Sequence, residues 1–131
     1  LFLRLESKGA HNIDLVTPTL HATTLIRAIA NAKDKGLSIP IVWNSNAYEN
    51  VEMLKMMEGL VDVYLPDLKY VSDALSKKYS NAPNYFASAR KANWRIRNRW
   101  ERFSNKRNPR SAPLFTRLRR RYQKGHRLHI R

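Results

Sequence analysis

The chain has 131 residues and a formal net charge of +15, with 25 Lys and Arg against 10 Asp and Glu. This length allows one ordinary domain, and an apolar content of 43% can fill a modest core. No cysteine occurs, which excludes disulfides, thiolate metal sites and cysteine catalysis within these residues. A membrane span needs about 18 uninterrupted apolar residues, and no run in the sequence comes near that length. No signal peptide is visible. These features predict a cytoplasmic protein with no membrane partner.

The positive charge lies almost entirely in the last third of the chain. Residues 1–90 hold 10 Lys or Arg against 9 Asp or Glu, whereas residues 91–131 hold 15 against the single Glu101. Such a change in composition indicates two different parts. We place the boundary between residues 1–92 and residues 93–131.

Apolar and turn-forming residues predict alternating helices and strands in the first part. Gly9 and Gly36 are expected helix ends, and Pro18 closes the first strand. Pro40 fits only near the start of the second strand. In chain order, the sequence predicts a helix over 1–8, a strand over 12–17, a helix over 21–35, a strand over 37–43, a helix over 48–59, a strand over 60–65, and helices over 72–79 and 83–92.

Helices that alternate with strands over short connections are typical of crossover units around a parallel sheet. The predicted fold class is therefore α/β. A complete barrel of this kind needs about six to eight strands. With about three parallel strands, residues 1–92 are expected to form a slice of a partial (β/α) barrel.

The second part shows neither a helical nor a strand period for long. Residues 93–131 interleave Arg with aromatic residues and carry Pro109 and Pro113. Burial of so few apolar residues would not offset the entropy lost on ordering, so we expect a basic and mostly disordered tail.

Four linked motifs resemble one known family. They follow one another in the expected order and cover about 90 of the 131 residues. The motifs are GAHNIDLVTPT (9–19), GLSIPIVWN (36–44), VDVYLPDLKY (61–70) and KKYSNAPNY (77–85). Together they resemble the radical S-adenosylmethionine proteins related to the pyruvate formate-lyase activating enzymes.

The resemblance implies a partial (β/α) barrel that holds S-adenosylmethionine and a [4Fe-4S] cluster. In that family the reduced cluster cleaves S-adenosylmethionine to a 5′-deoxyadenosyl radical, and in the activating enzymes this radical abstracts a hydrogen atom from a glycine of a glycyl-radical-type partner protein. Asn44 matches a polar position near the ribose, and Asp67 and Lys69 match an Asp-x-Lys at a strand end. Thr17 and Thr19 follow another strand end and are expected to line the same face.

The sequence departs from the family pattern at several places. The family's Cys-x3-Cys-x2-Cys loop does not occur, and because the chain begins at Leu1 without methionine we expect that loop further upstream. Ala47 stands where a glycine is expected, and Thr19-Leu20-His21 replaces an expected Thr-His-aromatic run. The chain alone is therefore expected to be an inactive fragment of a radical S-adenosylmethionine oxidoreductase.

Two alternatives remain for the whole chain and two for its basic part. The chain is either a small nucleic-acid-binding protein that acts through residues 93–131, or a module that docks to a separate cluster-bearing chain. The basic part is either an evolved arm, with Arg for phosphates and Trp for stacking, or the product of a shifted reading frame. In either case we expect it to bind polyanions non-specifically.

Overall fold

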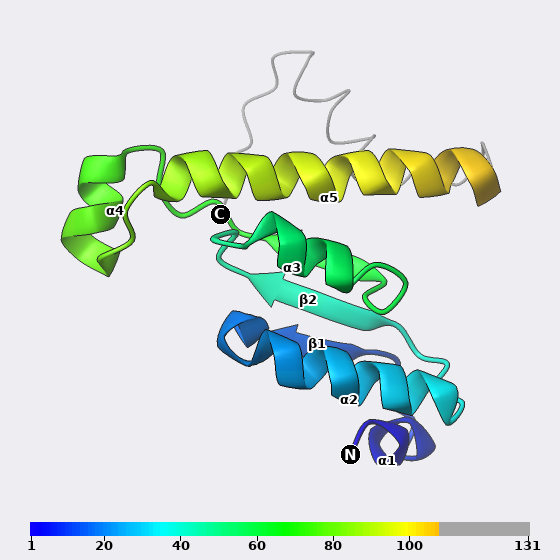
Figure 1. Cartoon of the computed structure of the whole chain (residues 1–131). Coiled ribbons are helices and arrows are strands. Elements are labelled where there is room, and N and C mark those ends of the chain that lie inside the picture. Colours follow the sequence, from blue (N-terminus) through cyan, green and yellow to red (C-terminus); the bar gives the residue numbers. More distant parts are fainter. Residues whose placement is uncertain (108–131) are drawn as a thin grey trace, which may run out of the picture. The chain divides into compact units, whose positions relative to one another are not determined.

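The computed structural model describes residues 1–107, and the side chains of residues 1–99. The chain divides into two units, Leu1–Ile96 and Arg97–Arg131, and the sheet and its core belong to the first. Figure 1 shows the elements. They are α1 (Phe2–Ser7), β1 (Ile13–Val16), the 3-10 turn η1 (Pro18–His21), α2 (Ala22–Asp34), β2 (Ile41–Ser45), α3 (Val51–Met56), β3 (Val63–Pro66), α4 (Asp73–Ser80) and α5 (Tyr85–Arg107).

The three strands form one parallel sheet in the order β1-β2-β3. Ile13 lies beside Ile41, and Val42 lies beside Val63. Parallel strands require crossover connections, which α2 and α3 supply in turn. The predicted α/β class with three parallel strands is confirmed.

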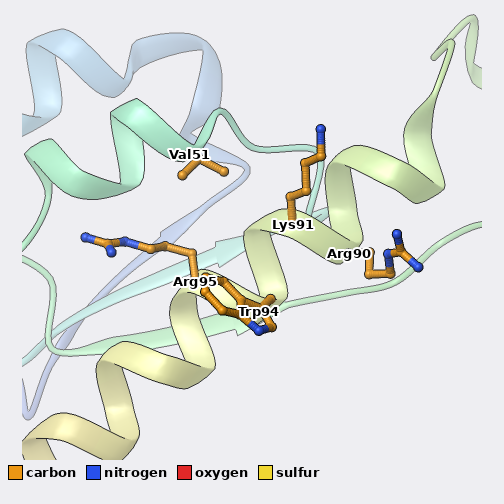
Figure 2. Close-up of a pocket in the computed structure, with 5 residues that line it drawn as sticks. All are labelled: Val51, Arg90, Lys91, Trp94 and Arg95. Atoms are coloured by element: carbon orange, nitrogen blue, oxygen red, sulfur yellow. The ribbon is translucent and has the colours of Figure 1, made fainter.

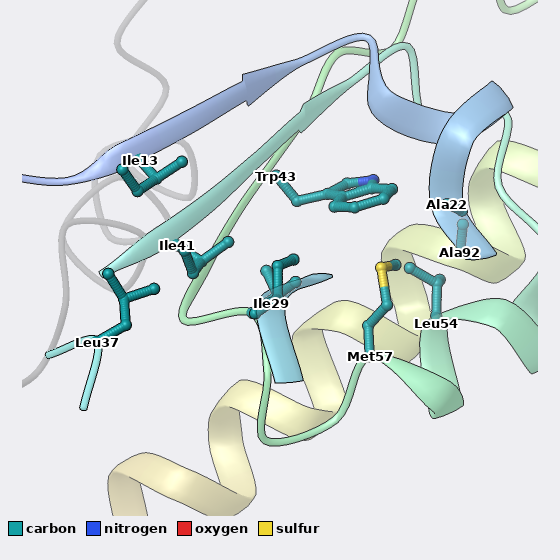
Figure 3. Close-up of a cluster of buried hydrophobic side chains, with 10 residues drawn as sticks. Ile13, Ala22, Ile29, Leu37, Ile41, Trp43, Leu54, Met57 and Ala92 are labelled. Carbon is teal, nitrogen blue, oxygen red and sulfur yellow. The ribbon is translucent and has the colours of Figure 1, made fainter. Parts of the chain in front are cut away.

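The hydrophobic core lies on one face of this sheet. Ile41 and Trp43 of β2 are fully buried there with Ile29 of α2. Leu54 of α3, Met57 just after it and Ala92 of α5 close the same cluster, as Figure 3 shows. Side chains alternate along a strand, so every second residue of β2 enters this core.

The opposite face of the sheet is not covered by the described residues. Val16, Val63 and Leu65 are 68%, 38% and 40% exposed, although Val42 in the central strand is buried. An apolar strand normally has both faces covered in an all-parallel sheet. In the described part of the chain this sheet therefore has a helix-covered face and an open apolar face.

Several boundaries differ from the sequence prediction by a few residues; β3, for example, begins at Val63 and not at residue 60. Two of these differences have clear local reasons. Strand β2 begins at Ile41, after Pro40, because proline has no N–H to donate to a ladder. Helix α3 begins only at Val51, since the Asn50 side chain accepts the Glu52 N–H at 2.7 Å and so caps the helix.

The predicted tail differs more strongly. The composition of residues 93–131 predicts a mostly disordered segment, but α5 continues to Arg107. Ala92 is fully buried and Ile96, four residues later, packs against the same core. Arg95 forms an ion pair with Glu58, and arginine is itself a good helix former. Residues 108–131 of the predicted tail lie outside the described residues.

Helix α1 packs Phe2 and Leu3 against the core, and its Glu6 carboxylate binds the segment that precedes β2. Glu6 Oε1 accepts the Ser38 hydroxyl at 2.6 Å, the Ser38 N–H at 3.0 Å and the Ile39 N–H at 3.1 Å. The Ser38 hydroxyl and the two backbone donors favour the charged form and lower the pKa of Glu6 below its ordinary value of 4.5, against a smaller effect of desolvation.

This lowered pKa predicts a pH-dependent contribution to stability. A folded-state pKa below the unfolded one stabilises the protein above about pH 4.5, and the stabilisation is lost as pH falls through the folded value. Glu6→Gln, which imitates the protonated acid, should lower the urea midpoint at pH 7. The difference from wild type should shrink below about pH 4.5. Glu52→Gln, on an exposed carboxylate, is the control, and an unchanged difference down to about pH 3 would contradict the assignment.

Candidate functional site

The residues singled out from the sequence follow the ends of three neighbouring strands. Thr17 follows β1, Asn44 lies near the end of β2, and Asp67 follows β3. The register places Val16 beside Asn44 and Asn44 beside Leu65. Because neighbouring strands lie about 4.8 Å apart, these positions span roughly 10 Å of one edge. We call this row the strand-end edge, and such edges bind ligands in open α/β sheets.

Thr17 is fixed by its backbone. Its φ of 53° lies in the left-handed region, and its N–H donates to the Asn44 carbonyl at 2.8 Å. The chain turns there into η1, which begins with the buried Pro18. The Thr17 side chain is exposed and can meet a ligand at the strand-end edge.

Thr19, also predicted at the strand-end edge, binds a carboxylate of the protein itself. Its hydroxyl donates to Glu49 Oε1 at 2.8 Å, so the side chain is engaged within the protein. Trp43 Nε1 donates to the same oxygen at 3.0 Å. Glu49 is 4% exposed, and its other oxygen, Oε2, has no partner among the described residues. Thr19 therefore helps to hold a buried carboxylate.

Asn44 lies on the open face of the sheet. Trp43 and Ser45, on either side of it, are buried on the core side, and Asn44 is half-buried. Its amide lies in the row formed with Val16 and Leu65. An amide presents both donors and an acceptor, so at this place it can bind a ligand hydroxyl.

Asp67 and Lys69 form an exposed ion pair. Lys69 Nζ lies 2.8 Å from Asp67 Oδ2. The hydrogen bond and the charge of Asp67 raise the pKa of Lys69 above its ordinary value, while desolvation acts in the opposite sense. Any anionic ligand of Lys69 would therefore compete with Asp67.

Sequence reasoning missed Tyr85, which fixes the backbone of this edge. Its buried hydroxyl accepts the Lys69 N–H at 2.7 Å. The hydroxyl proton faces the carbonyls of Asn46 at 2.6 Å and Asp67 at 3.1 Å. The Tyr85 ring lies 5.6 Å from Tyr48 and 5.4 Å, edge-on, from Tyr70. Helix α5 thus holds together the loops that follow β2 and β3.

The structure brings Thr17, Asn44, Asp67 and Lys69 to one edge and directs Thr19 toward Glu49. Among the described residues there is no group of three His, Asp or Glu that can hold a metal ion. Nor does any helix in that part of the chain combine the length and apolar character needed to cross a membrane. The fold and the site define a mixed α/β unit with polar groups at the carboxyl edge of a parallel sheet.

The chain is similar to one curated protein. It is 39% identical over 69 residues to the uncharacterized protein MJ0674 of Methanocaldococcus jannaschii, a match that covers 53% of this chain. The matched part spans about a fifth of that relative's length (20%). No family model matches the chain, and no solved structure matches it.

Proposed function

We propose that residues 1–92 belong to a radical S-adenosylmethionine protein related to the pyruvate formate-lyase activating enzymes, and form a slice of its partial barrel. The parallel order β1-β2-β3, with crossover helices, supports this interpretation. The core helices pack on one face of the sheet and leave the other face open, as in a barrel with outer helices. Further strands on both sides of the sheet would complete the barrel.

The observation that carries the proposal is the strand-end edge. Asn44 lies near the end of β2 and Asp67 just after the adjacent parallel strand β3, and barrel enzymes bind their ligands at such strand ends. The Asn44 amide and the Asp67 carboxylate are suited to ribose hydroxyls, and Lys69 to the carboxylate of the methionine group. Thr17 adds an exposed hydroxyl at the same edge. These roles concern binding and orientation of S-adenosylmethionine.

The backbone at Ala47 agrees with the same resemblance. The resemblance expects a glycine at this position, and the structure has a φ of 63° there. That value lies in the left-handed region, which costs an L-residue about 1–2 kcal/mol and which glycine adopts without strain. The backbone at Ala47 therefore has a conformation that suits glycine better than alanine.

The residues present do not fit the iron–sulfur cluster. A [4Fe-4S] cluster of this family needs three thiolates from protein, and none of the 131 residues is a cysteine. In the proposed parent protein the cluster, the radical step and the glycyl-radical-type partner would therefore depend on residues outside this sequence. For this chain we propose a contribution to S-adenosylmethionine binding and, as part of the same proposal, a cytoplasmic location.

The proposed binding can be tested with S-adenosylhomocysteine, which keeps the ribose and amino-acid groups. We expect saturable ¹H–¹⁵N chemical-shift changes at Thr17, Asn44 and Asp67, with a Kd on the order of 1 mM for such a partial site. Asn44→Ala should weaken binding several-fold, whereas Asn31→Ala, at an exposed asparagine of α2, should not. Shifts confined to other regions, or equal effects of the two variants, would overturn the assignment.

The relationship to the family has its own test in the DNA on both sides of the reading frame. We expect an upstream frame that encodes Cys-x3-Cys-x2-Cys. A barrel continuation in a shifted downstream frame would make residues 93–131 a frameshift product. Flanking DNA without the cysteine motif would count against the radical S-adenosylmethionine proposal.

A further inference from the structure

A shallow hollow lies between helix α3 and the first half of α5. Its volume is about 500 Å³, which is in the range of ligand sites. Its walls are Val51 from α3 and Arg90, Lys91, Trp94 and Arg95 from α5 (Figure 2). All five residues belong to the first unit, and none of them is a residue of the strand-end edge. We call it the α5 hollow.

Helix α5 divides its residues between core and hollow. Ala89 and Ala92 are fully buried, whereas Trp94 is 65% exposed. Trp94 lies four residues after Arg90 and three after Lys91, so the three share one side of the helix. A tryptophan that leaves most of its ring in water contributes little to the core, and its π face remains open to a planar partner.

The charge of the hollow is positive and only partly compensated. Arg95 is paired with Glu58, the acidic side chain that reaches this helix from the α3 end. Within the part of the chain that the structure describes, Arg90 and Lys91 form no ion pair. Two cations therefore remain available to an anion beside an exposed aromatic ring.

The directions of the cations favour an extended anion over a single phosphate. Figure 2 shows the head groups of Arg90 and Lys91 pointing away from each other, with Arg95 directed to a third side. In this arrangement the head groups do not converge on one phosphate group. It suits a backbone with successive phosphates, and the exposed Trp94 ring suits an unpaired base.

We propose that the α5 hollow binds single-stranded nucleic acid, with one base stacked on Trp94 and neighbouring phosphates on Arg90 and Lys91. A duplex fits this surface less well, because its bases are already stacked and paired. The inference is independent of S-adenosylmethionine binding at the strand-end edge. It also differs from the disordered arm predicted from the sequence, because it locates recognition on an ordered surface of the first unit.

The decisive measurement must separate this surface from the general attraction of a basic chain for polyanions. We would measure the binding of a labelled dT12 oligonucleotide to the full 131-residue chain by fluorescence anisotropy at about 150 mM salt. Trp94→Ala should weaken binding about 5- to 150-fold, the range for loss of one stacked base. Trp94→Phe should lie between this variant and wild type. Tyr79→Ala, which removes another exposed aromatic side chain beside lysines, should have less than a twofold effect.

A charge-matched pair of variants tests the phosphate contacts. Arg90→Gln with Lys91→Gln and Lys77→Gln with Lys78→Gln remove the same charge from α5 and α4. Only the pair of substitutions on α5 should make the plot of log association constant against log salt concentration less steep. The slope should fall in magnitude by about 1.4, the value for two single-strand phosphates.

Far-UV circular dichroism confirms the fold of each variant, and a dA12·dT12 duplex serves as the competing ligand. Trp94→Ala within twofold of wild type would overturn the proposal. Equal losses for the two charge pairs, or tighter binding of the duplex, would do so as well.

Discussion

Replacement of Trp43 with alanine is expected to remove a large part of the stability of the first unit. Trp43 is 1% exposed at the centre of β2, and large-to-alanine changes at such sites cost about 3–5 kcal/mol. The indole N–H also donates to Glu49, which would keep only the hydrogen bond from Thr19. The total free energy of unfolding of a domain of this size is roughly 5–15 kcal/mol. Urea unfolding followed by far-UV circular dichroism should show a large fall in the midpoint, or no cooperative transition.

Trp43→Phe separates the two contributions. Phenylalanine keeps most of the ring volume but has no donor for Glu49 Oε1. Trp43→Phe should therefore lower the free energy of unfolding by about 1–3 kcal/mol. A Trp43→Ala variant that loses less than about 2 kcal/mol would show that the core relaxes around the cavity. It would also show that Glu49 finds another donor.

The strands of the fold could be predicted from sequence because their signals are local. Buried parallel strands have continuous apolar runs, and Ile41–Ser45 and Val63–Pro66 lie within or beside such runs. The strand-end positions of Asn44 and Asp67 follow once the strands are known to be parallel. Element boundaries moved by a few residues where proline or a side-chain cap intervened, as at Pro40 and Asn50.

The parts that could not be predicted depend on contacts between distant residues. Nothing near Tyr85 in the sequence shows that its hydroxyl meets Asn46, 39 residues earlier. Glu49 resembles a solvated charge until Thr19, 30 residues away, and Trp43 are seen to donate to it. Composition also predicts that ordered structure ends near residue 93, whereas α5 continues to Arg107. Average composition does not reveal that Ala92 and Ile96 share one packed side of this helix. High charge does not by itself imply disorder, since a basic helix can be anchored by a few apolar residues.

Because of these long-range contacts, substitution of Tyr85 is also expected to lower the stability strongly. Tyr85→Phe keeps the ring against Tyr48 and Tyr70 but removes the hydroxyl that joins the Asn46, Asp67 and Lys69 backbones. The unmet backbone groups should cost about 1–3 kcal/mol in the free energy of unfolding. Tyr85→Ala, which also empties a buried site, should cost about 3–5 kcal/mol.

The matched control for the hydroxyl is Tyr79→Phe, at a tyrosine that is 66% exposed, and it should change stability by less than about 0.5 kcal/mol. Because the Tyr85 hydroxyl joins the loops after β2 and β3, its loss should act locally before it acts globally. Amide hydrogen exchange of Tyr85→Phe should therefore rise at Asp67 and Lys69 more than at Ile41 and Trp43 in the core strand. Equal acceleration at all four amides would mean that Tyr85 supports the whole unit through its ring and has no special role at the strand-end edge. A selective rise would establish the hydroxyl as the group that holds the Asp67–Lys69 backbone in place.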